Sequence, residues 1–199
     1  MAYTNFTLEK LQDQFGISAI DSPVLTAVKP VPVSSWLTET LHRMSDSAFK
    51  TRSEKARSEF IIAPILTEML ERNEHRFALF SGQYFDVEPE VGLSGECDFL
   101  LTLQPKASIV SAPVFALIEA KKQDIEAGLG QCAAQMLAAQ RFNERKETPQ
   151  KAVYGCVTTG EIWQFLKLHE STLEIDTERY YLNELELLIG ALQAVIDTF

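Results

Sequence analysis

Two short apolar segments of the chain each carry a carboxylate, and a lysine follows the second one. Asp98 lies within residues 95–101, and Glu119 and Lys121 close residues 115–121. A carboxylate inside such a run is costly to bury unless it is paired or holds a metal ion. Two carboxylates and a lysine that meet in space can bind Mg²⁺, or Mn²⁺ in its place, and hydrolyse phosphodiesters.

Strand geometry predicts that these groups meet. Successive side chains of a strand alternate, so the odd-numbered residues from Phe115 to Lys121 are expected to point to one side. If the two strands pair, Asp98 and Glu119 converge within reach of one ion, because Mg²⁺ needs only one or two carboxylates besides its waters. Lys121 would orient or deprotonate an attacking water. Repulsion between the acids predicts a raised pKa for one of them when no metal is bound.

A third acid is predicted on a helix upstream. Thr51 and Glu54 form a capping-box pattern, which predicts that a helix begins there. Pro64 is expected to kink this helix, because its ring displaces the bond to the Phe60 carbonyl. The predicted apolar stripe of the helix contains Glu59 together with Ile62, Ala63, Leu66 and Leu70.

The Glu-x-Lys pattern alone is a weak indicator, because the chain contains it twice. The copy Glu144-Arg145-Lys146 lies at the polar end of a predicted helix, where a solvated role is expected. Glu119 differs through the apolar strand before it and the acidic strand upstream. Taken singly, each acid also has an ordinary explanation: a strand-end salt bridge for Glu119, a turn or cap for Asp98, and a charge at the stripe's rim for Glu59.

The remaining elements predict a single α/β domain over the 199 residues. Helices are expected at about 5–15, ending at Gly16, from Ser35, at about 124–144 and from the capping box at Asn183, with an extended arm at 17–33. Strands are expected near 77–80, 84–87, 152–157, 162–168 and 173–175, besides the two acidic ones. Gly128 and Gly130 would let another backbone or a ligand approach the long helix. This order predicts one central mixed sheet flanked by helices.

Composition narrows the function classes. Apolar residues make up 46% and charged residues 23% of the chain, as in ordinary soluble domains. No apolar run reaches about 18 residues, and the first residues do not resemble a secretory signal, so no membrane partner is expected. Cys97, Cys132 and Cys156 form no C-x-x-C pair and are predicted to be buried, reduced thiols of a cytoplasmic protein.

The net charge of −10 counts against tight nonspecific binding of nucleic acid, which usually requires a basic face. Charge can nevertheless be local. The candidate nucleic-acid contacts are Lys50, Arg52, Lys55, Arg57, Lys122 and Gln135. A solvated helix face is the alternative explanation for the basic cluster at 50–57.

The pattern resembles the PD-(D/E)XK nuclease superfamily, over about residues 51–168. It is most similar to the N-terminal nuclease domains of type I restriction subunits. The matching residues are Glu59 in 58–62, Asp98 in Gly95-Glu96-Cys97-Asp98, the triplet Glu119-Ala120-Lys121, and Gln131 in Gly130-Gln131-Cys132. Two features depart from the family pattern: Cys97 stands where proline is common, and the overall charge is acidic.

The resemblance implies a restriction-endonuclease-like sheet, with residues 1–50 and 169–199 added around the core. It implies that Asp98 and Glu119 bind Mg²⁺ or Mn²⁺ and that Lys121 assists the water. Glu59 would contact the metal directly or through water, and Gln131 would touch the phosphate or steady the site. The expected substrate is nucleic acid, with DNA favoured.

Two alternative functions and the state of assembly remain open at this point. The chain could be a non-catalytic module that keeps the nuclease fold for binding or assembly, although a retired site has no physical reason to keep buried charges. A hydrolase of small phosphates lacks a Gly-rich phosphate motif in this sequence. Because cutting both strands needs two sites, a homodimer or a larger restriction or repair complex is compatible with the prediction.

Overall fold

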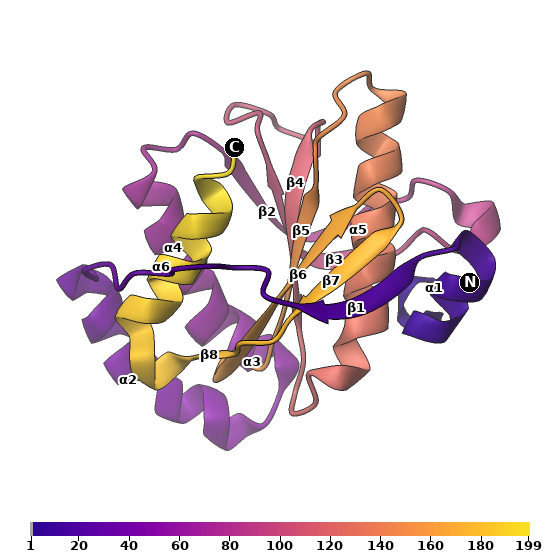
Figure 1. The fold of residues 1–199 in the computed structure, drawn as a ribbon. Coiled ribbons are helices and arrows are strands. Elements are labelled where there is room, and N and C mark those ends of the chain that lie inside the picture. Colours follow the sequence, from indigo (N-terminus) through magenta and orange to yellow (C-terminus); the bar gives the residue numbers. More distant parts are fainter. Residues whose placement is uncertain (1) are drawn as a thin grey trace.

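The computed structural model describes residues 2–199, which form an α/β fold around one mixed sheet (Figure 1). The helices are α1 Leu8–Phe15, α2 Ser35–Thr51, α3 Glu54–Arg57, α4 Ala63–Arg72, α5 Glu126–Arg145 and α6 Leu185–Ile196, with a π-helical turn at Ser58–Ile62 and 3₁₀ turns at Tyr3–Asn5, Pro89–Val91 and Leu182–Glu184. The strands are β1 Ser18–Ser22, β2 Ala78–Tyr84, β3 Glu96–Thr102, β4 Val114–Ala120, β5 Val153–Thr158, β6 Ile162–His169, β7 Thr172–Asp176 and β8 Tyr180–Tyr181. The predicted α/β class with a flanked mixed sheet is confirmed.

The strands lie in the order β1-β7-β6-β5-β4-β3-β2, and β8 pairs with β6. The β4–β5 and β1–β7 pairs are parallel and the others are antiparallel. β4 therefore lies near the middle of the sheet, between β3 and β5, and all of its residues are buried. The sheet extends beyond both ends of the segment 51–168, because β1, β7 and β8 also belong to it.

Helices cover both faces of the sheet (Figure 1). Side chains of α2, α4 and α6 form one hydrophobic core with the sheet, and α1 and α5 form the other. The three cysteines are free and buried in these cores, as predicted. Among residues 2–199, no helix is both long and apolar enough to cross a bilayer.

Two predicted helix starts are wrong. The Thr51 hydroxyl donates to carbonyls within α2, and it is Ser53 that caps α3 by accepting from the Ala56 N–H. Asn183 lies in a 3₁₀ turn, and α6 begins at Leu185 without a side-chain cap. The first error matters for the site, because it frees the Glu54 carboxylate from a capping role.

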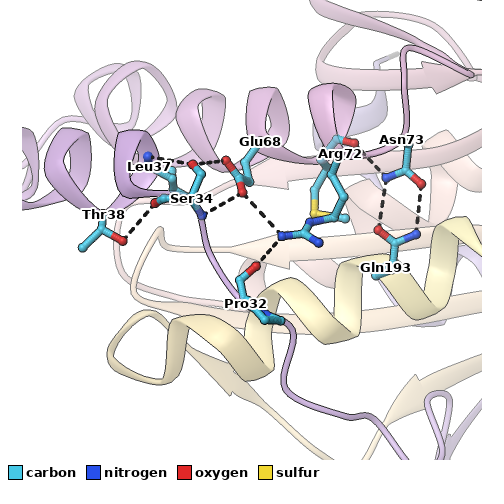
Figure 2. Close-up of polar contacts among 9 residues, drawn as sticks. Pro32, Ser34, Leu37, Thr38, Glu68, Arg72, Asn73 and Gln193 are labelled. Carbon is cyan, nitrogen blue, oxygen red and sulfur yellow. Dashed lines mark hydrogen bonds and ion pairs between the residues drawn. The ribbon is translucent and has the colours of Figure 1, made fainter.

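The arm between β1 and α2 is bonded to α4 (Figure 2) and also crosses closely over α6. Glu68 of α4 is buried and accepts hydrogen bonds from the backbone N–H and the hydroxyl of Ser34, and it also pairs with Arg72. On α6, a side chain at Gly190 would lie 2.0 Å from the Lys29 carbonyl oxygen, so only glycine lets the arm cross there. Ser34, rather than the expected Ser35, caps α2.

A bulge in β4 corrects the predicted strand faces. The β3–β4 register shifts where Leu101 pairs with Ala116 but Thr102 pairs with Val114, which leaves Phe115 as an extra residue. Phe115 therefore packs in the α2–α4–α6 core, whereas Leu117 packs against α5. A bulge of this kind reverses the alternation of the residues before it and leaves the residues after it in step. Glu119 follows Leu117 toward α5, as expected for its end of the strand.

Candidate functional site

The acidic site lies where β3 and β4 pair. The paired register ends with Phe99 opposite Ile118, and Asp98 and Glu119 are the next residues along the two strands. The two side chains lie close enough together for each to affect the pKa of the other. Asp98 Oδ2 accepts a hydrogen bond of 2.7 Å from the N–H of Ala120, which follows Glu119. The two acids therefore meet, as strand geometry predicts.

A chain of polar contacts surrounds Glu119. Lys121 Nζ lies 2.8 Å from Glu119 Oε1 and donates to Gln131 Oε1 at 2.9 Å. On the other side, Gln135 Nε2 donates to Glu119 Oε2 at 2.8 Å. Glu119 and Gln135 are 3% and 0% exposed. Both oxygens of a buried carboxylate are thus bonded, and two residues of α5 hold the Glu-x-Lys triplet in place.

Burial dominates the electrostatics of the two acids. Burial and, to a lesser extent, the nearby Asp98 carboxylate together raise the pKa of Glu119 to about 7, even though Lys121 and Gln135 act to lower it. Burial also raises the pKa of Asp98, which the Ala120 N–H and Lys121 partly offset. This agrees with the expected raised pKa of a metal-free acid pair. Burying two like charges at one point is costly, so the site favours a proton or an additional cation.

Gly128 of α5 makes the position of Lys121 possible. A Cβ at Gly128 would lie 2.5 Å from Val157 Cγ1 and 3.0 Å from Lys121 Cγ. The Lys121 N–H also donates to the Thr158 carbonyl at 2.7 Å. The lysine is therefore held by β5 through its backbone and by α5 through its side chain. Gly130 serves another purpose, since a Cβ there would lie 2.4 Å from the Phe6 carbonyl oxygen.

The predicted third acid, Glu59, is not part of this cluster. Its side chain is 54% exposed and its ion pair is with Lys55, at 3.6 Å. The reason is the π-turn, which adds one residue to the helical repeat and rotates Glu59 off the apolar stripe. A different helix acid, the exposed Glu54, lies near the pair instead. Its Oε1 accepts from the Lys122 N–H at 3.1 Å, and its charge raises the pKa of Asp98.

The structure divides the predicted nucleic-acid contacts. Gln135 is fully buried against Glu119, and Arg57 is 8% exposed with a hydrogen bond to the Thr159 carbonyl, so neither offers a surface to a polyanion. Both predictions are wrong because burial depends on tertiary contacts. Four others are exposed. Lys50 pairs with Asp46 of α2, and Lys55 pairs with Glu59 of the π-turn that follows α3. Arg52 lies two residues before Glu54, and Lys122 donates its backbone N–H to Glu54.

The sequence contained one usable signal for Glu54, which was the polar pair Ser53-Glu54 just before an amphipathic helix.

Within residues 2–199, no three His, Cys, Asp or Glu side chains lie close enough together to hold a metal ion by themselves. The donor set nevertheless fits Mg²⁺ or Mn²⁺, which needs few carboxylates and keeps its own waters. Asp98 and Glu119 would bind such an ion, and Glu54 could reach it through one of those waters.

No known family matches this chain, and neither a characterised protein nor a solved structure shows significant similarity to it. Function must therefore be inferred from the site itself.

Proposed function

We propose that the protein is a metal-dependent nuclease with a PD-(D/E)XK-like fold, acting on nucleic acid and preferentially on DNA. One observation carries the proposal: two carboxylates with raised pKa values and a lysine meet at the end of paired central strands. Buried charges of this kind lower stability and recur at functional sites. A purely structural site would be more stable with apolar residues in the same space.

Each residue has a defined task in this proposal. Asp98 and Glu119 hold Mg²⁺ or Mn²⁺, whose chemistry is to polarise the phosphoryl oxygen and activate water. Lys121 would orient or deprotonate the attacking water and offset charge on the phosphate. Gln131 and Gln135 keep Lys121 and Glu119 in position, rather than contacting substrate. The exposed Arg52 and Lys122 would contact the flanking phosphates, since Arg52 lies two residues before Glu54 and Lys122 donates its backbone N–H to Glu54.

A non-catalytic module is the second candidate, and one observation favours it. The contacts among Gln131, Lys121, Glu119 and Gln135 satisfy the carboxylate without a metal ion. Lys121 already supplies a positive charge at 2.8 Å from Glu119. If the only role of Lys121 were to neutralise the Glu119 carboxylate, the site would bind neither metal nor phosphate.

Cleavage and metal binding separate the two candidates. Supercoiled plasmid and linear single-stranded DNA are incubated with the protein and Mg²⁺ or Mn²⁺, and then with a chelator. The nuclease proposal expects metal-dependent cleavage that Asp98→Ala and Lys121→Ala each reduce by at least about 10²-fold.

Lys146→Ala, in the second Glu-x-Lys copy, is the matched control and is expected to cut normally. Cleavage that survives both site substitutions would refute the assigned roles. An absence of cleavage together with an absence of metal binding in calorimetry would favour the module.

A further inference from the structure

A buried arginine connects α3 to the turn between β5 and β6. Arg57 is 8% exposed, its Nη1 donates to the Thr159 carbonyl, and its guanidinium carbon lies 5.0 Å above the centre of the Phe49 ring. Arg57 Nε has no partner among residues 2–199. A guanidinium with an unpaired buried donor is less stable in this space than an apolar side chain of the same size. We therefore ask which neighbouring element the arginine holds in place.

The Thr159 carbonyl is adjacent to the acidic site. The preceding carbonyl, that of Thr158, accepts the Lys121 N–H at 2.7 Å. The end of β5 thus holds the lysine of the site with one carbonyl and α3 with the next. Glu54 stands three residues before Arg57, on the same face of α3, and reaches the Lys122 N–H at 3.1 Å. Two contacts therefore hold α3 against the sheet: Arg57 bonds to the residue that follows β5, and Glu54 bonds to Lys122, which follows Lys121 at the end of β4.

The π-turn after Arg57 gives the helix two separate faces. The Ala63 N–H bonds to the Ser58 carbonyl, which is π-helical spacing. Ile61 and Ile62 within the turn are fully buried, and Ile61 packs on Gly160, next to Thr159. The extra residue lets the turn pack apolar side chains into the core while α3 keeps its acid toward the site. π-turns of this kind occur frequently at functional sites.

We propose that Arg57 is a positioning residue, which holds α3 on the Thr159 carbonyl so that the Glu54 carboxylate faces the Asp98–Glu119 pair. This inference rests on the proposed function for its consequence in catalysis, but the placement of Glu54 can be measured without activity. Arg57 touches neither metal nor substrate and acts only through Glu54.

The test compares Arg57→Met, Arg57→Lys and Glu54→Ala with the wild type. Amide hydrogen exchange at Lys122 reports the Glu54 contact directly, since Lys122 is exposed and Glu54 accepts its N–H. Arg57→Met is expected to speed this exchange as much as Glu54→Ala does, and to weaken Mn²⁺ binding in calorimetry by about 10-fold or more. Arg57→Lys, which keeps one donor, is expected to fall between. The melting temperature should fall only modestly, because Met removes the unpaired buried donor but also leaves the Thr159 carbonyl without its hydrogen bond from Arg57.

The double variant Glu54→Ala/Arg57→Met should bind Mn²⁺ no more weakly than Glu54→Ala alone, because one residue acts through the other. Arg43→Met, an exposed arginine of α2 paired with Glu39, is the control and should change nothing. Unchanged Lys122 exchange in Arg57→Met, or additive losses in the double variant, would overturn the positioning role. If Arg57→Met does not fold, Arg57→Lys carries the same comparison. If the wild type neither cuts DNA nor binds Mn²⁺ while Lys122 exchange still rises, the proposed function fails and the positioning of Glu54 stands.

Discussion

The two Glu-x-Lys copies of the chain, at 119–121 and 144–146, have the same pattern in opposite environments. Glu119 is buried at the end of a central strand and its ion pair with Lys121 is shielded by α5. Glu144 and Lys146 are exposed at the end of α5, where the Lys146 ammonium lies 6.0 Å from the Phe142 ring centre. An exposed ion pair contributes little, whereas a buried charge changes pKa values and attracts a counter-ion. The difference shows that chemistry here comes from the tertiary environment of the triplet and not from the triplet.

The largest expected contrast is between Glu119→Gln and Glu144→Gln. The first change removes a proposed metal ligand but keeps the size and shape of the side chain, so DNA cleavage should fall by about 10³-fold, in the range of metal and acid–base catalysis. The second should leave cleavage unchanged. Plasmid nicking rates and Mn²⁺ titration calorimetry measure both effects, and equal losses in the two variants would remove the distinction between the copies.

The pH dependence of stability gives the next largest effect. Burial raises the pKa of Glu119 from 4.5 to about 7, so the folded state binds a proton that the unfolded state has already released. Without metal, the free energy of unfolding should therefore fall as the pH rises from about 4.5 to 7, by about 3 kcal/mol. Urea unfolding at several pH values measures this slope.

Glu119→Gln should flatten that slope, since Gln does not titrate, and Glu144→Gln should keep it. Added Mg²⁺ should restore stability at pH 7 in the wild type and in Glu144→Gln, but not in Glu119→Gln. A slope that persists in Glu119→Gln would assign the titration to Asp98 or to another group.

A smaller effect is expected from the two glycines of α5. Gly128→Ala would place a methyl group 2.5 Å from Val157 Cγ1 and 3.0 Å from Lys121 Cγ, whereas Gly130→Ala would meet the Phe6 carbonyl oxygen. Both should cost about 1–3 kcal/mol of stability through overpacking. Only Gly128→Ala should also slow cleavage below the unfolding temperature, because it displaces the lysine. Equal cleavage by both variants, measured well below melting, would contradict the role given to Gly128.

The smallest effect concerns substrate affinity. Lys122→Ala should weaken binding of a labelled oligonucleotide by only a few-fold and reduce the salt dependence by about one phosphate contact. Lys106, exposed in the loop between β3 and β4, serves as the control. Fluorescence anisotropy at several salt concentrations measures both variants, and an equal salt dependence in all three proteins would place the nucleic acid elsewhere.

The apolar patterning around Asp98 and Glu119 was enough to predict two paired strands, the meeting of the acids and the α/β class. Local signals also predicted the end of α1 at Gly16 and the buried, free cysteines, and both are confirmed. These features depend on neighbours within a few residues, through side-chain alternation, backbone conformation and burial propensity. These properties can be read from a short stretch of sequence.

The identity of the helix acid could not be obtained in this way. Glu54 and Glu59 are both glutamates near the start of a helix, and an ideal helical repeat selects Glu59. A π-turn and a cap at Ser53 reverse that choice, and both are set by how Ile61, Arg57 and the β5–β6 turn pack together. The burial of Gln135 and Arg57 likewise depends on residues far away in the chain. The sequence thus indicated which residue types could form a site and which strands could pair. The direction of each helical side chain was decided only by packing, because an offset of one residue in a helix changes whether a carboxylate faces solvent or the site.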